Sequence, residues 1–255
     1  MSEFAPDYSR AHRRASPNFG PRRGGIKPKL LILHYTGMDN GQAAEDWLCS
    51  HESGVSAHYL VHEDGRIVQM VPEAARAWHA GKSIWNGASD VNSLSIGVEI
   101  ANRGHAYGYP DFPEPQVEAV IALSRDICLR HRILPQNVLA HSDVAPGRKI
   151  DPGEKFPWDR LARAGVGHFV DPMAPDQGNV LSTGARGEPV LALQAMLALY
   201  GYGIEQTGVY DTATEIVVGA FQRHFRPARV DSIADSSTRD VLKTLLKTLP
   251  ARAGD

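Results

Sequence analysis

Cysteine, long apolar runs and an excess of either charge are all scarce in this chain of 255 residues. The two cysteines, Cys49 and Cys128, lie in helix-like patterns, so we expect free thiols and no role in binding a metal. No segment approaches the roughly eighteen consecutive apolar residues of a membrane-spanning helix, which predicts no membrane span. The net charge of −2 lacks the basic excess typical of nucleic-acid binding, so we expect no nucleic-acid partner.

Glycine and proline are concentrated between residues 162 and 185, where they interrupt every periodic pattern. The length of the chain suits one domain of about 150 residues plus a smaller one. We therefore predict a first domain over residues 1–165, a linker over 166–185 and a second domain over 186–255. Residues 1–29 are rich in Arg, Pro, Gly and Ser, which predicts an extended lead-in that is loosely ordered at its start.

The apolar patterns predict an α/β (α+β) fold for the first domain, with a mixed central β-sheet flanked by helices. Residues 30–33 are continuously apolar, which is typical of a strand buried on both faces. The Asp64-Gly65 pair between two alternating runs predicts a hairpin. Strands are expected at 30–34, 55–62, 66–71, 95–100 and 138–141, and helices at 43–52 and 115–131. Three further helices, at 188–200, 212–225 and 236–246, predict a small helical C-terminal domain.

The stretch from His141 to Gly153 contains a histidine, two aspartates and a lysine, and its two Pro-Gly pairs predict a loop. His141 ends one apolar strand, and His34 ends another. Two histidines and an aspartate suit a catalytic zinc ion, which takes three protein ligands and keeps one position open for water. The spacing alone leaves open whether Asp143 or Asp151 is the third ligand.

Glu99 lies on the polar side of a strand in which Ile96, Val98 and Ile100 face the other way. Burying a carboxylate on a central strand costs free energy unless it has a partner or a function. We therefore interpret Glu99 as a catalytic acid and base. Lys149 is the natural donor to a developing oxyanion.

Five motifs occur in a fixed order, at residues 34–36, 55–60, 77–81, 95–100 and 141–153. Together they resemble the zinc-dependent N-acetylmuramoyl-L-alanine amidases of the AmpD/AmiD type, the amidase 2 family, over roughly residues 15–165. The resemblance implies Zn²⁺ bound by His34, His141 and Asp151, with Asp143 capping its own loop. It also agrees with the roles given to Glu99 and Lys149.

The same resemblance suggests further site residues. Substrate contacts are expected from His79, Asn102, Tyr35 and Trp85. His58 and Trp78 are expected as pocket walls or supports behind the ligands. Aromatic rings beside Gly and Asn suit contact with a sugar or peptide, because a ring offers a flat apolar face.

The C-terminal segments at 187–197, 208–214 and 221–222 resemble a three-helix peptidoglycan-binding module. Gln206-Thr207 replaces the usual Asp-Gly of that module, and Gly219 falls in the middle of a helix. A role as a spacer or in dimerisation therefore stays open as the alternative to binding peptidoglycan.

The expected reaction is hydrolysis of the amide bond between N-acetylmuramic acid and L-alanine in peptidoglycan or muropeptides. The expected partner is peptidoglycan or an anhydro-muropeptide, and no obligate protein partner is inferred. The alternatives are a non-catalytic peptidoglycan recognition protein, which typically lacks a zinc ligand, and a zinc peptidase acting on stem peptides.

The first ten residues carry acidic side chains and no apolar segment, so they do not resemble a secretory signal. This favours the cytoplasm, whereas a wall-binding module favours the periplasm. Because every candidate catalytic residue precedes the linker, we expect residues 1–165 to fold and act without the C-terminal domain.

Overall fold

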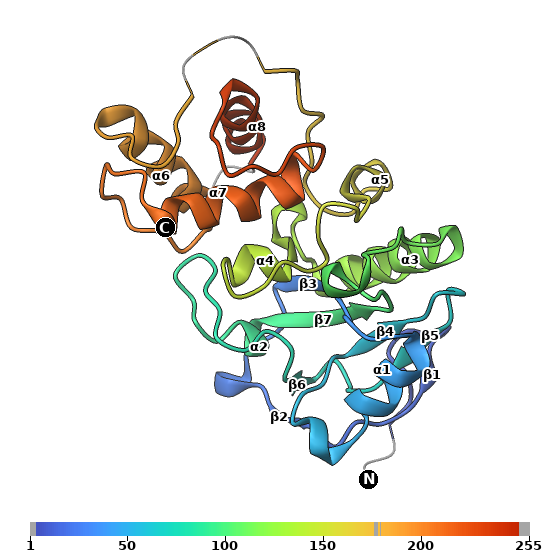
Figure 1. Cartoon of the computed structure of the whole chain (residues 1–255). Helices are drawn as coiled ribbons and strands as arrows, with labels where there is room; N and C mark the ends of the chain where they lie inside the picture. Colours follow the sequence, from blue (N-terminus) through green and yellow to red (C-terminus); the bar gives the residue numbers. More distant parts are fainter. Residues whose placement is uncertain (1–3, 176–177, 179, 250–255) are drawn as a thin grey trace.

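The protein is described here by a computed structural model that covers residues 4–175, 178 and 180–249. Residues 1–3 of the predicted lead-in, 176, 177 and 179 of the predicted linker, and 250–255 of the predicted C-terminal domain lie outside the described residues. Figure 1 shows a sheet with helices on its faces and, packed on one side, the C-terminal helices coloured orange to red.

The central sheet has six strands in the order β1-β5-β4-β7-β3-β8. β3 lies between β7 and β8 and is parallel to both, whereas β4 and β5 form an antiparallel hairpin. A separate pair joins β2 and β6. The strands are β1 (His12–Arg13), β2 (Phe19–Pro21), β3 (Leu30–Tyr35), β4 (Tyr59–Val61), β5 (Ile67–Gln69), β6 (Ala75–Ala77), β7 (Ser95–Ile100) and β8 (Val138–Ala140). The predicted mixed sheet flanked by helices and the predicted hairpin at Asp64-Gly65 are both confirmed.

The helices of the catalytic part are α1 (Gly41–Leu48), α2 (Val91–Leu94), α3 (Glu114–His131), α4 (His141–Val144) and α5 (Trp158–Arg163). Those of the C-terminal module are α6 (Glu188–Tyr200), α7 (Thr212–Phe225) and α8 (Ser236–Lys247). Short 3-10 turns occur at Arg23–Gly25, His51–Ser53, His105–Tyr107 and Pro135–Asn137. Within the described part of the chain, none of the helices has the length and apolar character needed to cross a bilayer.

The strand predicted at 55–62 begins only at Tyr59. The backbone of Ser56 pairs with a loop instead of a strand, because its N–H donates to the carbonyl of Trp78 at 3.1 Å. The hydroxyl of Ser56 accepts from the N–H of Trp78 at 3.0 Å. Residues 55–58 therefore form a loop that lies beside the loop at residue 78.

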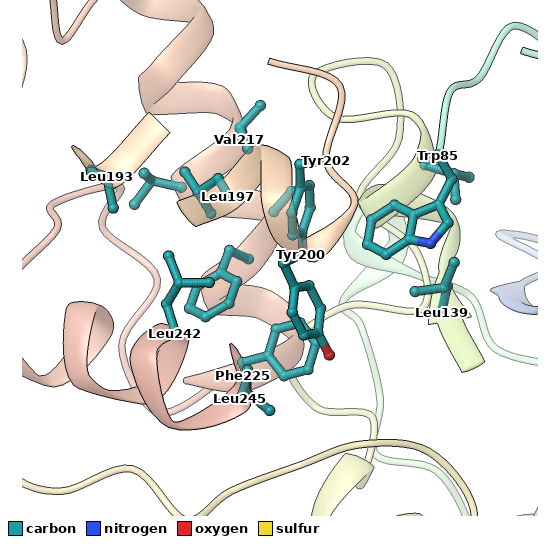
Figure 2. Packing of buried hydrophobic residues seen from close by; sticks show 14 of the residues in the cluster. Trp85, Leu139, Leu193, Leu197, Tyr200, Tyr202, Val217, Phe225, Leu242 and Leu245 are labelled. Carbon is teal, nitrogen blue, oxygen red and sulfur yellow. The ribbon is translucent and has the colours of Figure 1, made fainter. Parts of the chain in front are cut away.

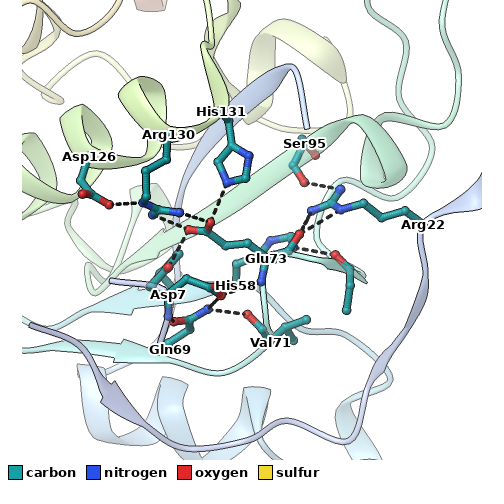
Figure 3. A network of polar contacts seen from close by, with 12 residues as sticks. Asp7, Arg22, His58, Gln69, Val71, Glu73, Ser95, Asp126, Arg130 and His131 are labelled. Atoms are coloured by element: carbon teal, nitrogen blue, oxygen red, sulfur yellow. Dashed lines mark hydrogen bonds and ion pairs between the residues drawn. The ribbon is translucent and has the colours of Figure 1, made fainter. Parts of the chain in front are cut away.

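The described part of the lead-in is an integral part of the fold, whereas residues 1–3, at the start that was expected to be loosely ordered, lie outside the described residues. β1 pairs with β5, and Tyr8 is buried in the core. Arg22 is also buried, and its guanidinium donates to the carbonyls of Ser93 at 2.8 Å and Ser95 at 3.0 Å (Figure 3). The same group donates to the carbonyl of Glu73 at 2.8 Å. The lead-in therefore fixes the start of β7.

The two faces of β3 belong to different clusters of buried side chains. Leu31 and Leu33 pack with residues of α3. Leu30 and Ile32 face the other way and pack with Leu139 of β8 in a cluster that continues into the C-terminal module. Because side chains alternate along a strand, His34 shares the face of Leu30 and Ile32. The module therefore covers the face of the sheet that carries the first candidate ligand.

Trp85 lies at the centre of the contact between the catalytic part and the module (Figure 2). Its side chain is 1% exposed, and its ring meets those of Tyr200 and Tyr202 edge-on, with centroid distances of 6.2 and 5.1 Å. The prediction that Trp85 contacts substrate is therefore wrong, because the module occupies its surface. Removing the module would expose this face to water, so the structure argues against independent folding of residues 1–165.

We predict that Trp85→Ala lowers the free energy of unfolding by about 3–5 kcal/mol, because it leaves a large cavity between the two parts. Urea denaturation followed by circular dichroism measures the effect. Trp47→Ala is the matched control, since Trp47 is 41% exposed and its loss should cost less than about 1 kcal/mol. Equal losses in the two variants would contradict this assignment of Trp85.

Candidate metal centre and active site

Three side chains that could hold a metal ion converge at the ends of β3 and β8. His34 is near the end of β3, His141 begins α4 directly after β8, and Asp151 lies in the loop that follows. The Nδ1 atoms of the two histidines are 2.8 Å apart, and Asp151 Oδ2 lies 3.2 Å from His34 Nδ1 and 3.0 Å from His141 Nδ1. All three side chains are buried. Parallel neighbouring strands end at the same edge of the sheet, which brings the two histidines together.

The orientation of His34 follows from a chain of hydrogen bonds. The hydroxyl of Ser95 donates to the carbonyl of Val91 at 2.7 Å, so it accepts from His79 Nε2–H at 3.1 Å. His79 Nδ1 is then an acceptor for His34 Nε2–H, at 3.0 Å. His34 is left with an unprotonated Nδ1 that faces Asp151.

His141 is held in the same way from the other side. Its Nε2–H donates to the carbonyl of Ala80 at 3.1 Å. Its Nδ1 is therefore also unprotonated and faces the same point as that of His34. A metal ion could bind here, because two imidazole lone pairs and a carboxylate face the same point. Hydrogen bonds or packing hold each of these groups in its orientation.

Burial also sets the protonation states that a metal requires. Burial, together with the neighbouring His141, lowers the pKa of His34 to about 4, and Asp151 opposes this shift. For Asp151, burial raises the pKa, but the neighbouring imidazoles of His141 and His34 outweigh burial and hold the pKa well below its usual range. At neutral pH His34 is neutral and Asp151 is ionised, and metal ligands need these states.

Glu99 lies directly beside His34 in the pairing of β7 with β3. Its Oε2 is buried and has no hydrogen-bond partner among the described residues. Burial raises the pKa of Glu99 well above its ordinary value, and Asp151 raises it further, whereas Lys149 opposes the shift. A buried carboxyl with a raised pKa and a free oxygen suits proton transfer near neutral pH.

Glu99 and Asp151 line a cavity of about 320 Å³. The cavity is also lined by Tyr35, Thr36, Gly37, Leu48, Val55, Ser56, Trp78, His79, His141, Arg148, Lys149 and Ile150. A second cavity of about 270 Å³ shares Glu99 and Thr36 with it and is walled by Met38 and Trp47. This apolar second cavity was not expected from the sequence, because its apolar wall at Met38, Ala44, Trp47 and Leu48 comes from α1 and the loop before it, which carry no motif.

The structure brings some of the predicted substrate contacts to the cavity and not others. Tyr35 lies in its wall, with its hydroxyl 3.0 Å from His105 Nδ1. His79 also lies there, but both of its ring nitrogens are engaged by His34 and Ser95. Asn102 is buried elsewhere: its amide donates to the carbonyl of Pro110 at 2.9 Å and accepts from Gly104 N–H at 2.9 Å. The side chain of Asn102 therefore holds a loop and is not available to a substrate.

The two residues predicted as walls or supports have different positions. Trp78 lines the cavity. His58 is fully buried behind it, where its Nδ1 accepts from Gly97 N–H at 2.9 Å. A Cβ on Gly97 would lie 2.5 Å from the ring of His79, so only glycine leaves room for that imidazole on the sheet.

Sequence reasoning missed two residues that hold the ligands. Arg148 donates to the carbonyl of Ala80, the same carbonyl that orients His141. Ser95 ends the chain of hydrogen bonds that orients His34. The position of Arg148 beside Lys149 could have indicated that Arg148 lies near the site. Nothing in the sequence distinguishes Ser95 from any other serine at the start of a strand.

We predict that the metal-free protein loses stability relative to Glu99→Gln as the pH rises above 4.5. Above pH 4.5 an unfolded chain releases the proton of Glu99 while the folded protein still keeps it, so unfolding is favoured by up to about 1.4 kcal/mol per pH unit until the folded protein also releases the proton. Glutamine does not titrate and removes this slope. Denaturation of both proteins between pH 4.5 and pH 8 measures the difference, and parallel stability profiles would contradict the burial of an ionisable Glu99.

Comparisons with known proteins agree with this geometry. The family profile described as N-acetylmuramoyl-L-alanine amidase matches residues 24–154, and the profile of a peptidoglycan binding domain matches residues 186–242. The N-acetylmuramoyl-L-alanine amidase AmiD of Escherichia coli K12 is 38% identical over 233 residues, which cover 86% of this chain and 82% of that protein.

Two solved structures have the same architecture. One is the complex of E. coli AmiD with anhydro-N-acetylmuramic acid-L-Ala-D-gamma-Glu-L-Lys, with a TM-score of 0.73, 36% identity and 92% of each chain covered. The other is AmpDh3 of Pseudomonas aeruginosa in complex with anhydromuramic pentapeptide, with a TM-score of 0.73 and 29% identity over 98% of this chain and 100% of that one. The resemblance found in the sequence is thereby confirmed, and the chain belongs to the N-acetylmuramoyl-L-alanine amidase family.

Proposed function

We propose that this amidase binds Zn²⁺ through His34, His141 and Asp151 and hydrolyses the bond between N-acetylmuramic acid and L-alanine in anhydro-muropeptides. The observation that carries the proposal is the convergence of three buried ligand side chains beside a cavity that His141 and Asp151 line. Zinc suits two imidazole nitrogens and one carboxylate, and this set leaves a coordination position for water. When bound, the ion makes water more acidic and polarises the amide carbonyl.

Glu99 is the proton acceptor and donor of the proposed reaction. Its unpartnered Oε2 is free to take a proton from the attacking water and to return it to the departing amine of L-alanine. The high pKa of Glu99 suits this second step, because a stronger base holds the proton until the amine leaves. Lys149, in the wall of the same cavity, stabilises the negative charge that develops on the carbonyl oxygen.

The proposed substrate class rests on the two complexes with relatives and on the shape of the site. Those relatives were solved with anhydromuramyl peptides. The two cavities share Thr36, Leu48, Val55 and Glu99; the first also contains the charged side chains of Lys149 and Asp151, whereas the rest of the second is apolar. We assign the reacting amide to the boundary between them, since Glu99 borders both.

Product analysis tests the function. Purified protein with zinc is incubated with an anhydro-muropeptide, and the products are identified by mass spectrometry. The proposal predicts free anhydromuramic acid and a peptide that begins with L-alanine. Cleavage within the stem peptide would show a peptidase instead, and binding without cleavage would show a recognition protein.

We predict that Glu99→Ala and Lys149→Ala retain zinc but lose activity. Loss of an acid and base group costs about a hundred- to ten-thousand-fold in rate. Loss of one oxyanion donor costs about a hundred- to a thousand-fold. His34→Ala and Asp151→Ala should lose both zinc and activity, because they remove a ligand.

Elemental analysis after dialysis and the rate of peptide release measure these effects. Lys27→Ala and Glu52→Gln are the matched controls, since both residues are exposed and lie away from the cavity. They should leave zinc content and rate unchanged. Full zinc retention in Asp151→Ala would show that the third ligand is wrongly assigned.

A further inference from the structure

Asp143 is a fully buried carboxylate two residues after the metal ligand His141. Its Oδ2 accepts from Ala140 N–H at 2.8 Å, so it caps its own loop as the resemblance implies. It has two more partners, which come from the C-terminal module. Tyr202 donates its hydroxyl to Oδ1 at 2.6 Å, and His224 donates Nδ1–H to Oδ2 at 2.6 Å. A buried charge of the catalytic part is therefore satisfied largely by the module.

The element that carries both His141 and Asp143 cannot fix its own position. α4 has four residues, which is about one helical turn and too short to be stable in isolation. Its position depends on contacts with its surroundings. Ser142 N–H donates to the carbonyl of Asp151 at 3.0 Å, and the carbonyl of Val144 accepts from Ile84 N–H at 2.8 Å. The hydrogen bonds of Asp143 complete this support.

The module also contacts the chain between the ligands His141 and Asp151 and beyond them, at Gly147 and at Trp158, the first residue of α5. The ring of His224 stacks on that of Trp158, with centroids 3.7 Å apart. Gly147, in the loop between His141 and Asp151, lies so close to Ile216 of α7 that an added Cβ would be 3.0 Å from it. The loop that carries Lys149 and Asp151 therefore rests on the module as well.

Loss of the Tyr202 hydroxyl would leave Oδ1 of Asp143 without a donor among the described residues, and loss of the His224 ring would leave Oδ2 with Ala140 N–H alone. A buried carboxylate oxygen that lacks a donor raises the free energy of the folded protein. This penalty falls if the carboxylate moves toward water or another donor. Any such movement carries α4 with it. His141 is the first residue of α4, so its Nδ1 would leave the position at which it faces His34 and Asp151.

We propose that Tyr202 and His224 act through Asp143 as positioning residues for the metal ligand His141. The C-terminal module is then a structural part of the metal centre, whether or not it also binds peptidoglycan. The inference rests on the proposed role of His34, His141 and Asp151 as zinc ligands. Metal ligation is sensitive to such outer contacts, whose loss typically weakens binding by about ten- to a hundred-fold.

The test compares two phenylalanine variants of the full-length protein. Tyr202→Phe removes only the hydroxyl that reaches Asp143. Tyr210→Phe removes the hydroxyl of another buried tyrosine, which donates to the carbonyl of Ser232 at 2.7 Å, inside the module. Zinc affinity is measured by competition with a chelator, and ligand geometry by the visible spectrum of the Co²⁺-substituted protein. Thermal unfolding records the stability of each variant.

We expect Tyr202→Phe to bind zinc about ten-fold or more weakly and to shift the cobalt spectrum, because the ligand is displaced. Tyr210→Phe should keep the wild-type affinity and spectrum even if its melting temperature falls. A second pair provides a rescue: His224→Ala should lose zinc affinity, whereas His224→Asn should retain most of it. The asparagine amide can donate from nearly the same position as Nδ1.

Unchanged zinc affinity and spectrum in Tyr202→Phe would overturn the proposal. Equal losses in Tyr202→Phe and Tyr210→Phe would also overturn it, since they would reflect only weakened packing of the module. These measurements do not depend on hydrolysis. A wild-type protein that binds zinc but releases no peptide would therefore contradict the proposed reaction and leave this inference standing.

Discussion

The parallel pairing of β3 between β7 and β8 is the constraint on which the site depends. This pairing sets His34 beside Glu99 and sets Leu33 beside Ala140, the residue before His141. Two candidate ligands and the proposed proton acceptor are thus placed by backbone hydrogen bonds before their side chains meet. A slip of one residue in β3 would turn His34 to the face occupied by α3. The cluster that contains Leu30, Ile32 and Leu139 prevents this slip, because each face of β3 has its own buried partners.

Much of this fold could be predicted from the sequence, because the elements that form the site have strong local patterns. The apolar run at 30–33 and the alternation at 95–100 correspond to β3 and β7, and the helix expected at 212–225 has the bounds of α7. The missed strands β1, β2 and β6 have two or three residues each, which is too short for any period to be visible. Asp143 and Asp151 could not be separated by spacing, since both follow His141 within the one loop that the sequence predicts. In the structure Asp143 belongs to α4, and the hydrogen bond from Ser142 N–H to the carbonyl of Asp151 turns the second aspartate toward the two histidines.

The wrong predictions of substrate-contacting residues, Trp85 and Asn102, have a common physical cause. Trp85 and Asn102 lie in loops next to true site residues, and a sequence does not reveal which way a loop turns its side chains. The partners of Trp85 are Tyr200 and Tyr202, which lie beyond a linker that suggested two separate domains. Asn102 is used to close its own loop. The cytoplasmic location stays a prediction, as do the domain boundaries at 165 and 186, because no contact within the fold bears on them.

The order of synthesis gives the contact at Asp143 a further consequence. The ribosome makes His34 and Glu99 first, His141 and Asp151 later, and Tyr202 and His224 after all four. If Asp143 needs Tyr202 and His224 to hold α4 in place, a nascent chain lacks a fully supported metal centre until residue 224 has emerged. An amidase built in this way gains its full affinity for the metal only after the module has been made, so translation products that stop before the module would be poor hydrolases.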